Sequence, residues 1–140
     1  ASPEIEAELG AERLSLDELL ATSDVVTINC PYSQETHHLI GPEQFELMRS
    51  SAYLINTARG PIVDEAALVE ALRSGAIRGA GLDVYEHEPQ LEPGLDQLDN
   101  VVLIPHLGSA TVETRAAMAT LAARNTVAVL SGQPPLTPIA

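Results

Sequence analysis

Residues 51–83 read SAYLINTARGPIVDEAALVEALRSGAIRGAGLD, and this stretch decides the fold. Apolar runs at 52–55 and 79–82 flank a segment with a helical pattern, and that segment is bounded by Asp64 and Gly75. Aspartate caps the start of helices and glycine ends them, so a helix is predicted between the two residues. A strand, a helix and a strand in this order are typical of a crossover unit in a parallel sheet.

The same alternation extends outward on both sides. The strands are almost wholly apolar, without the alternation of a sheet that is wetted on one side, so we expect parallel strands with both faces covered. The predicted fold class is α/β, with about four parallel strands and one long irregular connection at 84–100. The other predicted elements are a helix capped by Ser15, a strand Val25–Asn29, a helix Pro42–Arg49, a strand Val101–Ile104 and a helix Val112–Leu130 capped by Thr111.

The composition indicates a folded, acidic chain. Apolar residues make up 45% of the 140 residues, which is enough for a packed core. Twenty acidic residues against seven arginines give a net charge of −13, and there is no lysine. The lack of lysine excludes chemistry that needs a Schiff-base or phosphate-loop lysine. Because an acidic surface repels nucleic acid and anionic lipid, we expect small-molecule or protein partners, with no nucleic acid and no membrane.

The sequence does not favour a metal site, a disulfide or a membrane span. Cys30 is the single cysteine, so an internal disulfide is excluded, and the four histidines show no paired-ligand spacing. We interpret His37 and His38 as exposed loop side chains rather than metal ligands. No apolar run approaches the roughly 20 residues of a membrane span, and the first residues do not resemble a secretion signal. We therefore expect a cytoplasmic protein without a bound metal.

Polar residues follow each predicted strand, at the edge where a parallel α/β sheet binds ligands. Asn29–Pro31, Asn56–Gly60, Asp83 and His106–Ser109 come after the four strands in turn. A histidine can give and take a proton, a carboxylate can favour its charged form, and an arginine can clamp a carboxylate. This combination suits the reduction of a 2-keto acid. The hydride would come from a nicotinamide cofactor, because no side chain supplies one.

Four segments resemble signature segments of the D-isomer-specific 2-hydroxyacid dehydrogenases. The resemblance covers about residues 14–137, and it implies a Rossmann-like parallel-sheet domain that binds NAD or NADP. The segments are LATSDVVTINCP at 20–31 with Thr36 and Ile40, MRSSAYLINTARG at 48–60 continuing to Val63 and Asp64, GLDVYEHEP at 81–89, and IPHLGSAT at 104–111.

The resemblance implies roles for single residues. Arg59 would orient the substrate, His106 would be the acid/base, and Glu88 would pair with His106. Asp83 would hold the nicotinamide end of the cofactor. On composition alone Glu86 is an alternative partner for His106, and only the family's spacing favours Glu88. The full set implied to contact the cofactor is Cys30, Pro31, Thr57, Ala58, Arg59, Asp83, His106 and Gly108.

Two features of the family are not found in these 140 residues: the Gly-x-Gly-x-x-Gly turn that holds the pyrophosphate, and the substrate domain. We therefore expect residues 1–132 to be the C-terminal portion of a dinucleotide-binding domain that lacks its first two strands. Residues 133–140 would be an exit tail toward the substrate domain. By themselves the 140 residues should be inactive, and they do not decide between NAD and NADP. The wording of the last two segments is most similar to that of glyoxylate/hydroxypyruvate reductases, which act on small 2-keto acids.

A rival hypothesis from another class is a non-catalytic interaction module. In this reading a truncated sheet pairs its open edge with another chain, because an exposed edge strand invites pairing. The same edge predicts a homo-oligomer, a dimer in the simplest case. The apolar positions of the helix Val112–Leu130 fit core packing, and they also fit a subunit interface. The acidic run Glu4–Glu12 is interpreted as a solvated surface.

Overall fold

The helix α4, Glu65–Ser74, shows how local sequence sets this fold. In the computed structural model, which describes residues 3–138, the Asp64 carboxylate caps this helix by accepting a hydrogen bond from the backbone N of Ala67 at 2.9 Å. Gly75 ends the helix in the left-handed region, at φ +75°. Glycine has no Cβ to clash in that conformation. Both boundaries of α4 agree with the sequence prediction.

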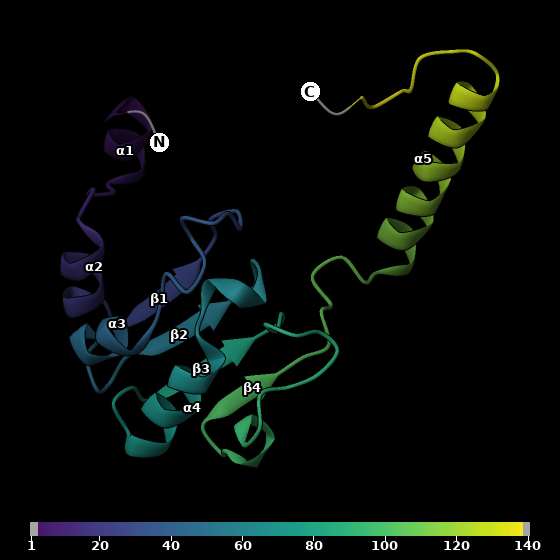
Figure 1. Ribbon diagram of the computed structural model, residues 1–140. Coiled ribbons are helices and arrows are strands. Elements are labelled where there is room, and N and C mark those ends of the chain that lie inside the picture. Colours follow the sequence, from purple (N-terminus) through teal and green to yellow (C-terminus); the bar gives the residue numbers. More distant parts are fainter. Residues whose placement is uncertain (1–2, 139–140) are drawn as a thin grey trace. The chain divides into compact units, whose positions relative to one another are not determined.

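The chain divides into two compact units, residues 1–105 and residues 106–140. In the first unit, helices and strands alternate along the chain, with two short 3-10 helices (Figure 1). Its other elements are α1 (Pro3–Leu9), α2 (Leu16–Thr22), β1 (Val25–Ile28), α3 (Pro42–Leu47), β2 (Tyr53–Asn56), η1 (Gly60–Ile62), β3 (Gly79–Leu82), η2 (Leu95–Gln97) and β4 (Val101–Leu103).

The four strands form one parallel sheet in the order β1-β2-β3-β4, which confirms the predicted α/β class. Val25 pairs with Tyr53, Tyr53 with Gly79, and Ala80 with Val101. All four strands therefore end at the same edge. Among the described residues, β1 and β4 are the outer strands, and each has one neighbour.

Two glycines in β3 allow its neighbours to approach closely. A Cβ at Gly79 would lie 2.8 Å from the carbonyl oxygen of Asn100 and 3.1 Å from the ring of Tyr53. A Cβ at Gly81 would lie 3.2 Å from Ile55 Cδ1. The missing side chains let the loop before β4 and the Tyr53 ring pack against the β3 backbone. This is why an otherwise weak strand sequence, GAGL, sits inside the sheet.

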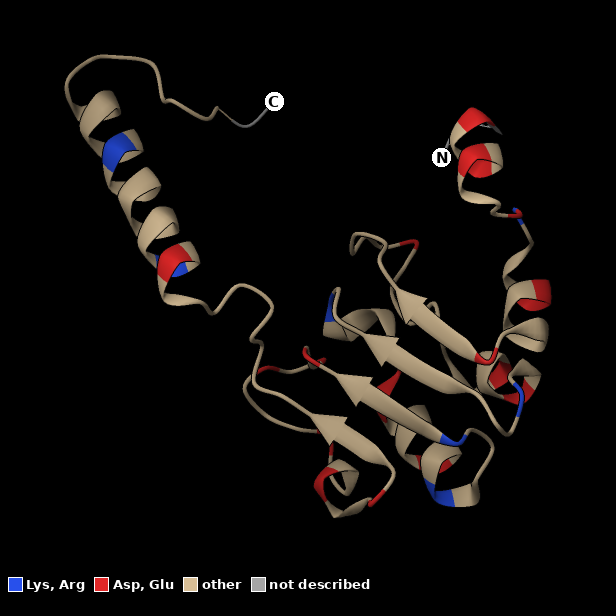
Figure 2. Cartoon of the chain, turned by 180° about the vertical axis from the view of Figure 1, so that it is seen from behind, with Lys and Arg blue, Asp and Glu red and all other residues tan. Residues whose placement is uncertain are grey.

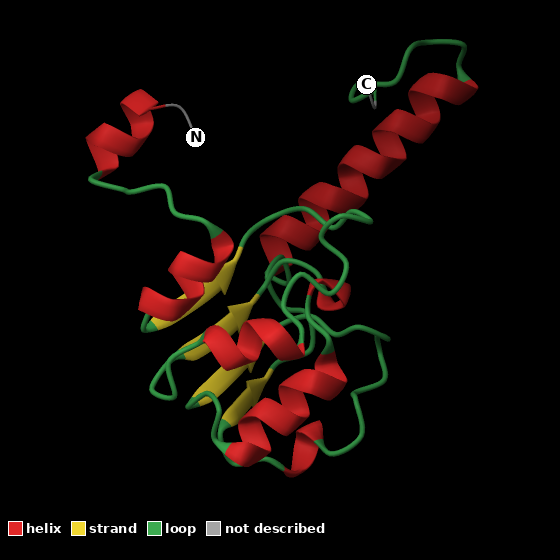
Figure 3. Ribbon diagram, turned by 60° about the vertical axis from the view of Figure 1, so that its left-hand side comes forward, coloured by secondary structure: helices red, strands yellow, loops and turns green. Residues whose placement is uncertain are grey.

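The helices α2, α3 and α4 of the first unit lie on one face of the sheet (Figure 3). Alternate strand residues turn toward them and are buried, such as Val26, Ile28 and Leu54. The other face leaves Tyr53 41% and Val102 66% exposed. The prediction that both faces are covered is therefore wrong for this unit. The reason is topological: consecutive crossovers of one hand, between strands in sequential order, place their helices on the same side.

Two other helices differ from expectation. The predicted helix Pro42–Arg49 ends at Leu47, because Met48 is extended at φ −70° and ψ 152°. The Arg49 side chain beyond it binds Asp24 at 3.0 Å and the Ala21 carbonyl at 3.2 Å. A helix that was not predicted, α1, overlaps the acidic run Glu4–Glu12, whose residues are exposed apart from the half-buried Glu6, as expected for a solvated surface. The predicted capping box of α2 is confirmed, since Ser15 Oγ accepts from the Glu18 backbone N and the Glu18 carboxylate accepts from the Ser15 backbone N.

The second unit consists of the helix α5, Val112–Leu130, and the segments on either side of it. Thr111 caps α5 through a bond from Thr114 N to its Oγ1 at 3.1 Å, as predicted. The tail returns to the helix, because Thr137 N donates to Asn125 Oδ1 at 3.2 Å. No residue of α5 is buried, so the expectation that its apolar positions pack into a core is not met.

The charged residues lie outside the strands of the sheet. The four strands, VVTI, YLIN, GAGL and VVL, contain no charged residue, and the acidic residues lie on helices and loops (Figure 2). In the described part of the chain, no helix has the length and apolarity needed to cross a membrane. Within residues 3–138 there is also no group of three or more His, Cys, Asp or Glu side chains placed to hold a metal ion.

Candidate functional site

A pocket of about 710 Å³ lies at the carboxyl ends of β1 and β2. Because the sheet is parallel, the segments after these strands lie side by side there. A smaller hollow of about 150 Å³ follows β3 and contains Asp83, and Thr57 lines both spaces. The larger pocket is lined by Asn29, Cys30, Pro31, Tyr32, Thr57, Ala58, Arg59 and Pro61, which include all the predicted site residues after β1 and β2.

Asn56 shapes the turn that carries Arg59. Its side chain is almost fully buried, at 1% exposure. Its Nδ2 donates to the Arg59 carbonyl at 3.0 Å, and its Oδ1 accepts from the Ala58 backbone N at 3.1 Å. One side chain at the end of β2 thus bonds one donor and one acceptor of the turn. The turn is fixed, while the Arg59 side chain remains exposed at the rim of the pocket.

Gly60 brings the Arg59 turn against the loop after β3. A Cβ at position 60 would lie 1.9 Å from the Tyr85 carbonyl carbon and 2.4 Å from the Glu86 nitrogen. Real Cβ atoms do not approach other atoms so closely, so only glycine fits without a shift of the backbone. The backbone of Gly60 is thus in direct contact with the Tyr85–Glu86 peptide, which lies two residues before Glu88.

The loop after β3 is anchored on buried groups. Asp83 is 4% exposed, and its backbone N donates to the Asn56 carbonyl at 3.0 Å. The buried Tyr85 donates its hydroxyl to the Ile104 carbonyl at 2.8 Å. Burial, together with the nearby Asp83 carboxylate, raises the pKa of the Tyr85 hydroxyl above its usual value, so this group stays protonated as a donor.

Glu88 closes a short turn in this loop. Its Oε1 accepts from the backbone N of Tyr85 at 3.1 Å, and the residue lies at the surface. The Glu88–Pro89 peptide bond is cis. The carboxylate predicted to assist the acid/base is therefore held by the backbone of its own loop.

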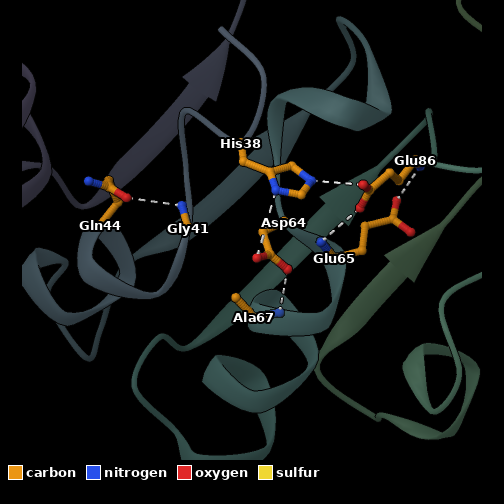
Figure 4. A network of polar contacts seen from close by, with 7 residues as sticks. All are labelled: His38, Gly41, Gln44, Asp64, Glu65, Ala67 and Glu86. Carbon is orange, nitrogen blue, oxygen red and sulfur yellow. Dashed lines mark hydrogen bonds and ion pairs between the residues drawn. The ribbon is translucent and has the colours of Figure 1, made fainter.

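A second carboxylate, Glu86, has partners elsewhere (Figure 4). Its Oε1 lies 2.7 Å from His38 Nε2, and its Oε2 accepts from the backbone N of Glu65 at 3.5 Å. Both oxygens are engaged, and neither contact involves a predicted catalytic residue. The alternative assignment of Glu86 as the partner of the acid/base thus competes with an existing network.

Glu65 completes the network from the first turn of α4. Its side chain is 3% exposed, and its Oε1 accepts from the Glu86 backbone N at 2.8 Å. Burial raises the pKa of the Glu65 carboxyl; the hydrogen bond from Glu86 N acts the other way, and the nearby Glu86 carboxylate raises the pKa further. Sequence reasoning assigned no role to Glu65, because a glutamate in the first turn of a helix is an ordinary feature.

The interpretation of both neighbouring histidines as exposed loop residues holds only for His37. His38 is half-buried, has a φ of +50°, and contacts Glu86; its Nδ1 also lies 3.9 Å from Asp64 Oδ2. The two imidazole rings stack, with centroids 4.0 Å apart. No sequence pattern predicted these contacts, because Asp64 and Glu86 lie 26 and 48 positions after His38 in the chain.

Two predicted site residues, His106 and Gly108, belong to the second unit. His106 is exposed and adopts a positive φ of +52°, a conformation that histidine tolerates better than most residues. In the first unit the structure brings together Cys30, Pro31, Thr57, Ala58 and Arg59 around the pocket.

Comparison with known proteins agrees with this geometry. Residues 1–108 match the sequence profile of the family described as D-isomer specific 2-hydroxyacid dehydrogenase, NAD binding domain. The chain belongs to this family. All four strands of its Rossmann-like sheet lie within the matched residues.

Individual dehydrogenases are similar over nearly the whole chain. A glyoxylate reductase from Thermococcus onnurineus is 54% identical over 135 residues, which are 96% of this chain and 40% of that protein. The NADPH-dependent glyoxylate/hydroxypyruvate reductase of Sinorhizobium meliloti, solved with NADP and malonate, is 40% identical with a TM-score of 0.82, covering 90% of this chain and 40% of that one. D-lactate dehydrogenase from Lactobacillus jensenii, solved with NAD⁺, is 29% identical with a TM-score of 0.81, covering 100% and 46%. The chain thus spans less than half the length of these dehydrogenases.

Proposed function

We propose that these residues form the nicotinamide-side part of an enzyme that reduces a small 2-keto acid, of the glyoxylate or hydroxypyruvate type, to the 2-hydroxy acid. The observation that carries the proposal is the strand-end pocket, where the exposed Arg59 and the backbone of residues 57–58 and 30–31 face one space. Family membership supports it, and so does the similarity to glyoxylate reductases. Since the chain spans about 40% of those relatives, the active protein in this proposal also contains a glycine-rich turn and a substrate domain.

The residues present fit a nicotinamide cofactor. The pocket has room for a flat ring beside the backbone of Thr57 and Ala58, and the buried Asp83 lies at the adjoining hollow, where its carboxylate could accept from an amide. When bound, the cofactor supplies the hydride. Cys30, Pro31, Thr57, Ala58, Arg59, Asp83, His106 and Gly108 are the residues we propose to hold it. Dehydrogenases of similar structure have been solved with NADP or with NAD⁺, and either fits this proposal.

Three side chains would bind the keto acid and supply the proton. Arg59 forms charge-assisted hydrogen bonds with the carboxylate of the keto acid and polarises the carbonyl next to it. His106 would donate a proton to the carbonyl oxygen of the keto acid, and this proton would become the hydroxyl hydrogen of the 2-hydroxy acid. Glu88 is the proposed partner that favours the protonated imidazole and fixes its orientation.

A kinetic comparison of two arginine variants tests the proposal. In the full-length polypeptide that carries these residues, Arg59→Ala should lower kcat/KM for glyoxylate reduction about a hundredfold, because a charged hydrogen-bonded clamp is lost. Arg78→Ala is the matched control, since Arg78 is exposed at the opposite, amino end of β3. Consumption of NADH and NADPH is followed with glyoxylate, hydroxypyruvate and pyruvate. No reduction of any of these acids by the unmodified protein, or equal losses in both variants, would contradict the assignment.

Association into a dimer is the second part of the proposal. The exposed face with Val25, Tyr53 and Val102 supports it, because apolar patches of this kind are commonly covered by another chain. The same observation favours the rival hypothesis of an interaction module. Sedimentation of the 140-residue chain decides whether it self-associates. A single compact species of 14.8 kDa at all concentrations would refute this part.

A further inference from the structure

The polar network of His38, Glu65 and Glu86 lies beside the proposed catalytic loop but contains none of its proposed catalytic residues. It joins three segments that are distant in sequence: the loop after β1, the start of α4 and the loop after β3 (Figure 4). We propose that these three residues form a clasp that positions Glu88 in the enzyme. The inference rests on the proposed function for its kinetic consequence, whereas the clasp itself can be tested without catalysis.

The clasp fixes the Glu86 residue from two sides. Glu65 Oε1 holds its backbone N at 2.8 Å, and His38 Nε2 holds its carboxylate at 2.7 Å. The Gly60 backbone packs against the preceding peptide, where a Cβ would come within 1.9 Å. With main chain and side chain both held, Glu86 has little freedom to move independently of α4 and the β1 loop.

The turn that carries Glu88 starts from this fixed point. Tyr85 is buried and bonded to the Ile104 carbonyl, and its backbone N donates to Glu88 Oε1 at 3.1 Å. Glu88 itself is exposed, so packing does not define where its carboxylate points. The bond from Tyr85 N ties this carboxylate to the Tyr85–Glu86 anchor.

His38 contributes more than a contact. Its backbone N donates to the Pro61 carbonyl at 2.9 Å, and Ile40 continues the pairing with Ile62 and Asp64. The charged groups around its ring are Glu86 on one nitrogen and Asp64 on the other, with His37 stacked on the face. The positive φ of His38 is a strained conformation, which the network holds in place.

Amide hydrogen exchange on the 140-residue chain tests the clasp directly. His38→Asn keeps a residue type that tolerates positive φ but is too short to reach Glu86. Loss of one hydrogen bond to a charged group should speed exchange of the Glu86 and Tyr85 amides about tenfold. His37→Asn removes the stacked ring but keeps the contact of His38 with Glu86, so as the control it should speed exchange of both amides less than His38→Asn does. The amides of β2 should not change in either variant. Unchanged exchange at Glu86 and Tyr85 in His38→Asn overturns the clasp.

Kinetics of the full-length enzyme test the positioning role. His38→Asn should lower kcat about tenfold at unchanged KM for the keto acid, because Arg59 still binds the substrate. It should also move the alkaline limb of the pH profile to lower pH, the direction expected for Glu88→Gln. Faster exchange with an unmoved pH profile would show a purely structural network and overturn the role in positioning. If the unmodified enzyme reduces no keto acid, the proposed function fails, while the exchange data still decide whether the clasp holds the turn.

Discussion

Replacing Gly60 by alanine should be among the most damaging small substitutions in this chain. The added Cβ would lie 1.9 Å from the Tyr85 carbonyl carbon and 2.0 Å from the carbonyl oxygen. Carbon contacts are most favourable at about 3.5–4.0 Å, so one backbone segment has to move by about 1.6 Å or more. The obstacle is main chain on both sides, and a flexible side chain cannot relieve it. The φ of Gly60 is not positive, so the cost comes from this overlap alone.

Forcing extra atoms into a packed site costs about 1–3 kcal/mol, and a backbone obstacle places Gly60→Ala near the upper end. A loss of about 3 kcal/mol should lower the thermal midpoint by about 10 °C in a chain of this size. It should also lower the urea midpoint by about 1.5 M for a slope of about 2 kcal/mol per M. Both transitions can be followed by circular dichroism.

Gly41→Ala is the control for this measurement. A Cβ at Gly41 meets its nearest neighbour, Gln44 Oε1, at 3.5 Å, which is an ordinary contact. Its cost should stay near that of a weakened helix cap, about 1 kcal/mol. If Gly60→Ala costs no more than Gly41→Ala, the two loops are not packed as described, and the steric argument for the placement of Arg59 beside the Glu88 loop fails.

Two further predictions concern carboxylates. In the full-length enzyme, Glu88→Gln removes the negative charge proposed to favour the protonated acid/base, so the alkaline limb of the reduction profile should move to lower pH. The isosteric Glu86→Gln still accepts from His38 and should leave this limb in place. The reverse result would assign the partner of the acid/base to Glu86. Glu65→Gln tests burial: because the folded-state pKa of Glu65 is raised, its contribution to stability is complete below the ordinary value of 4.5 and is lost as the pH rises through the folded value. Unfolding free energies measured across that range should therefore fall more in the unmodified chain than in Glu65→Gln, and parallel curves would show that the Glu65 carboxyl is not perturbed.

Local sequence signals predicted the elements well. Asp64 with Gly75, and Thr111 with the residues after Leu130, mark α4 and α5 at their observed boundaries. Capping depends on side chains within a few positions, so one sequence contains all the information it needs. The helix α3 ends at Leu47, before the predicted Arg49, where Met48 is already extended.

The site was predictable only in part. The strand ends placed Cys30, Pro31, Thr57, Ala58 and Arg59 around one pocket, as parallel pairing requires. The supporting contacts were not foreseen, because each joins segments far apart in sequence: His38 with Glu86, Glu65 with the Glu86 backbone, and Gly60 with Tyr85. The assignment of Glu88 and His106 as a catalytic pair stays a prediction that comes from the family's spacing.

The confinement of charge to helices and loops has a consequence for colloidal behaviour. In the 140-residue chain by itself, the edge strand β1, Val25–Ile28, has no charged side chain, so repulsion between two such edges comes from the net charge of −13 on the rest of the chain. That repulsion vanishes as the pH approaches the isoelectric point of about 4.4. Acid therefore weakens the electrostatic repulsion between two uncharged strand edges, and precipitation of the 140-residue chain near this pH is the expected outcome. The acidic residues of this chain therefore keep it dispersed in solution at neutral pH.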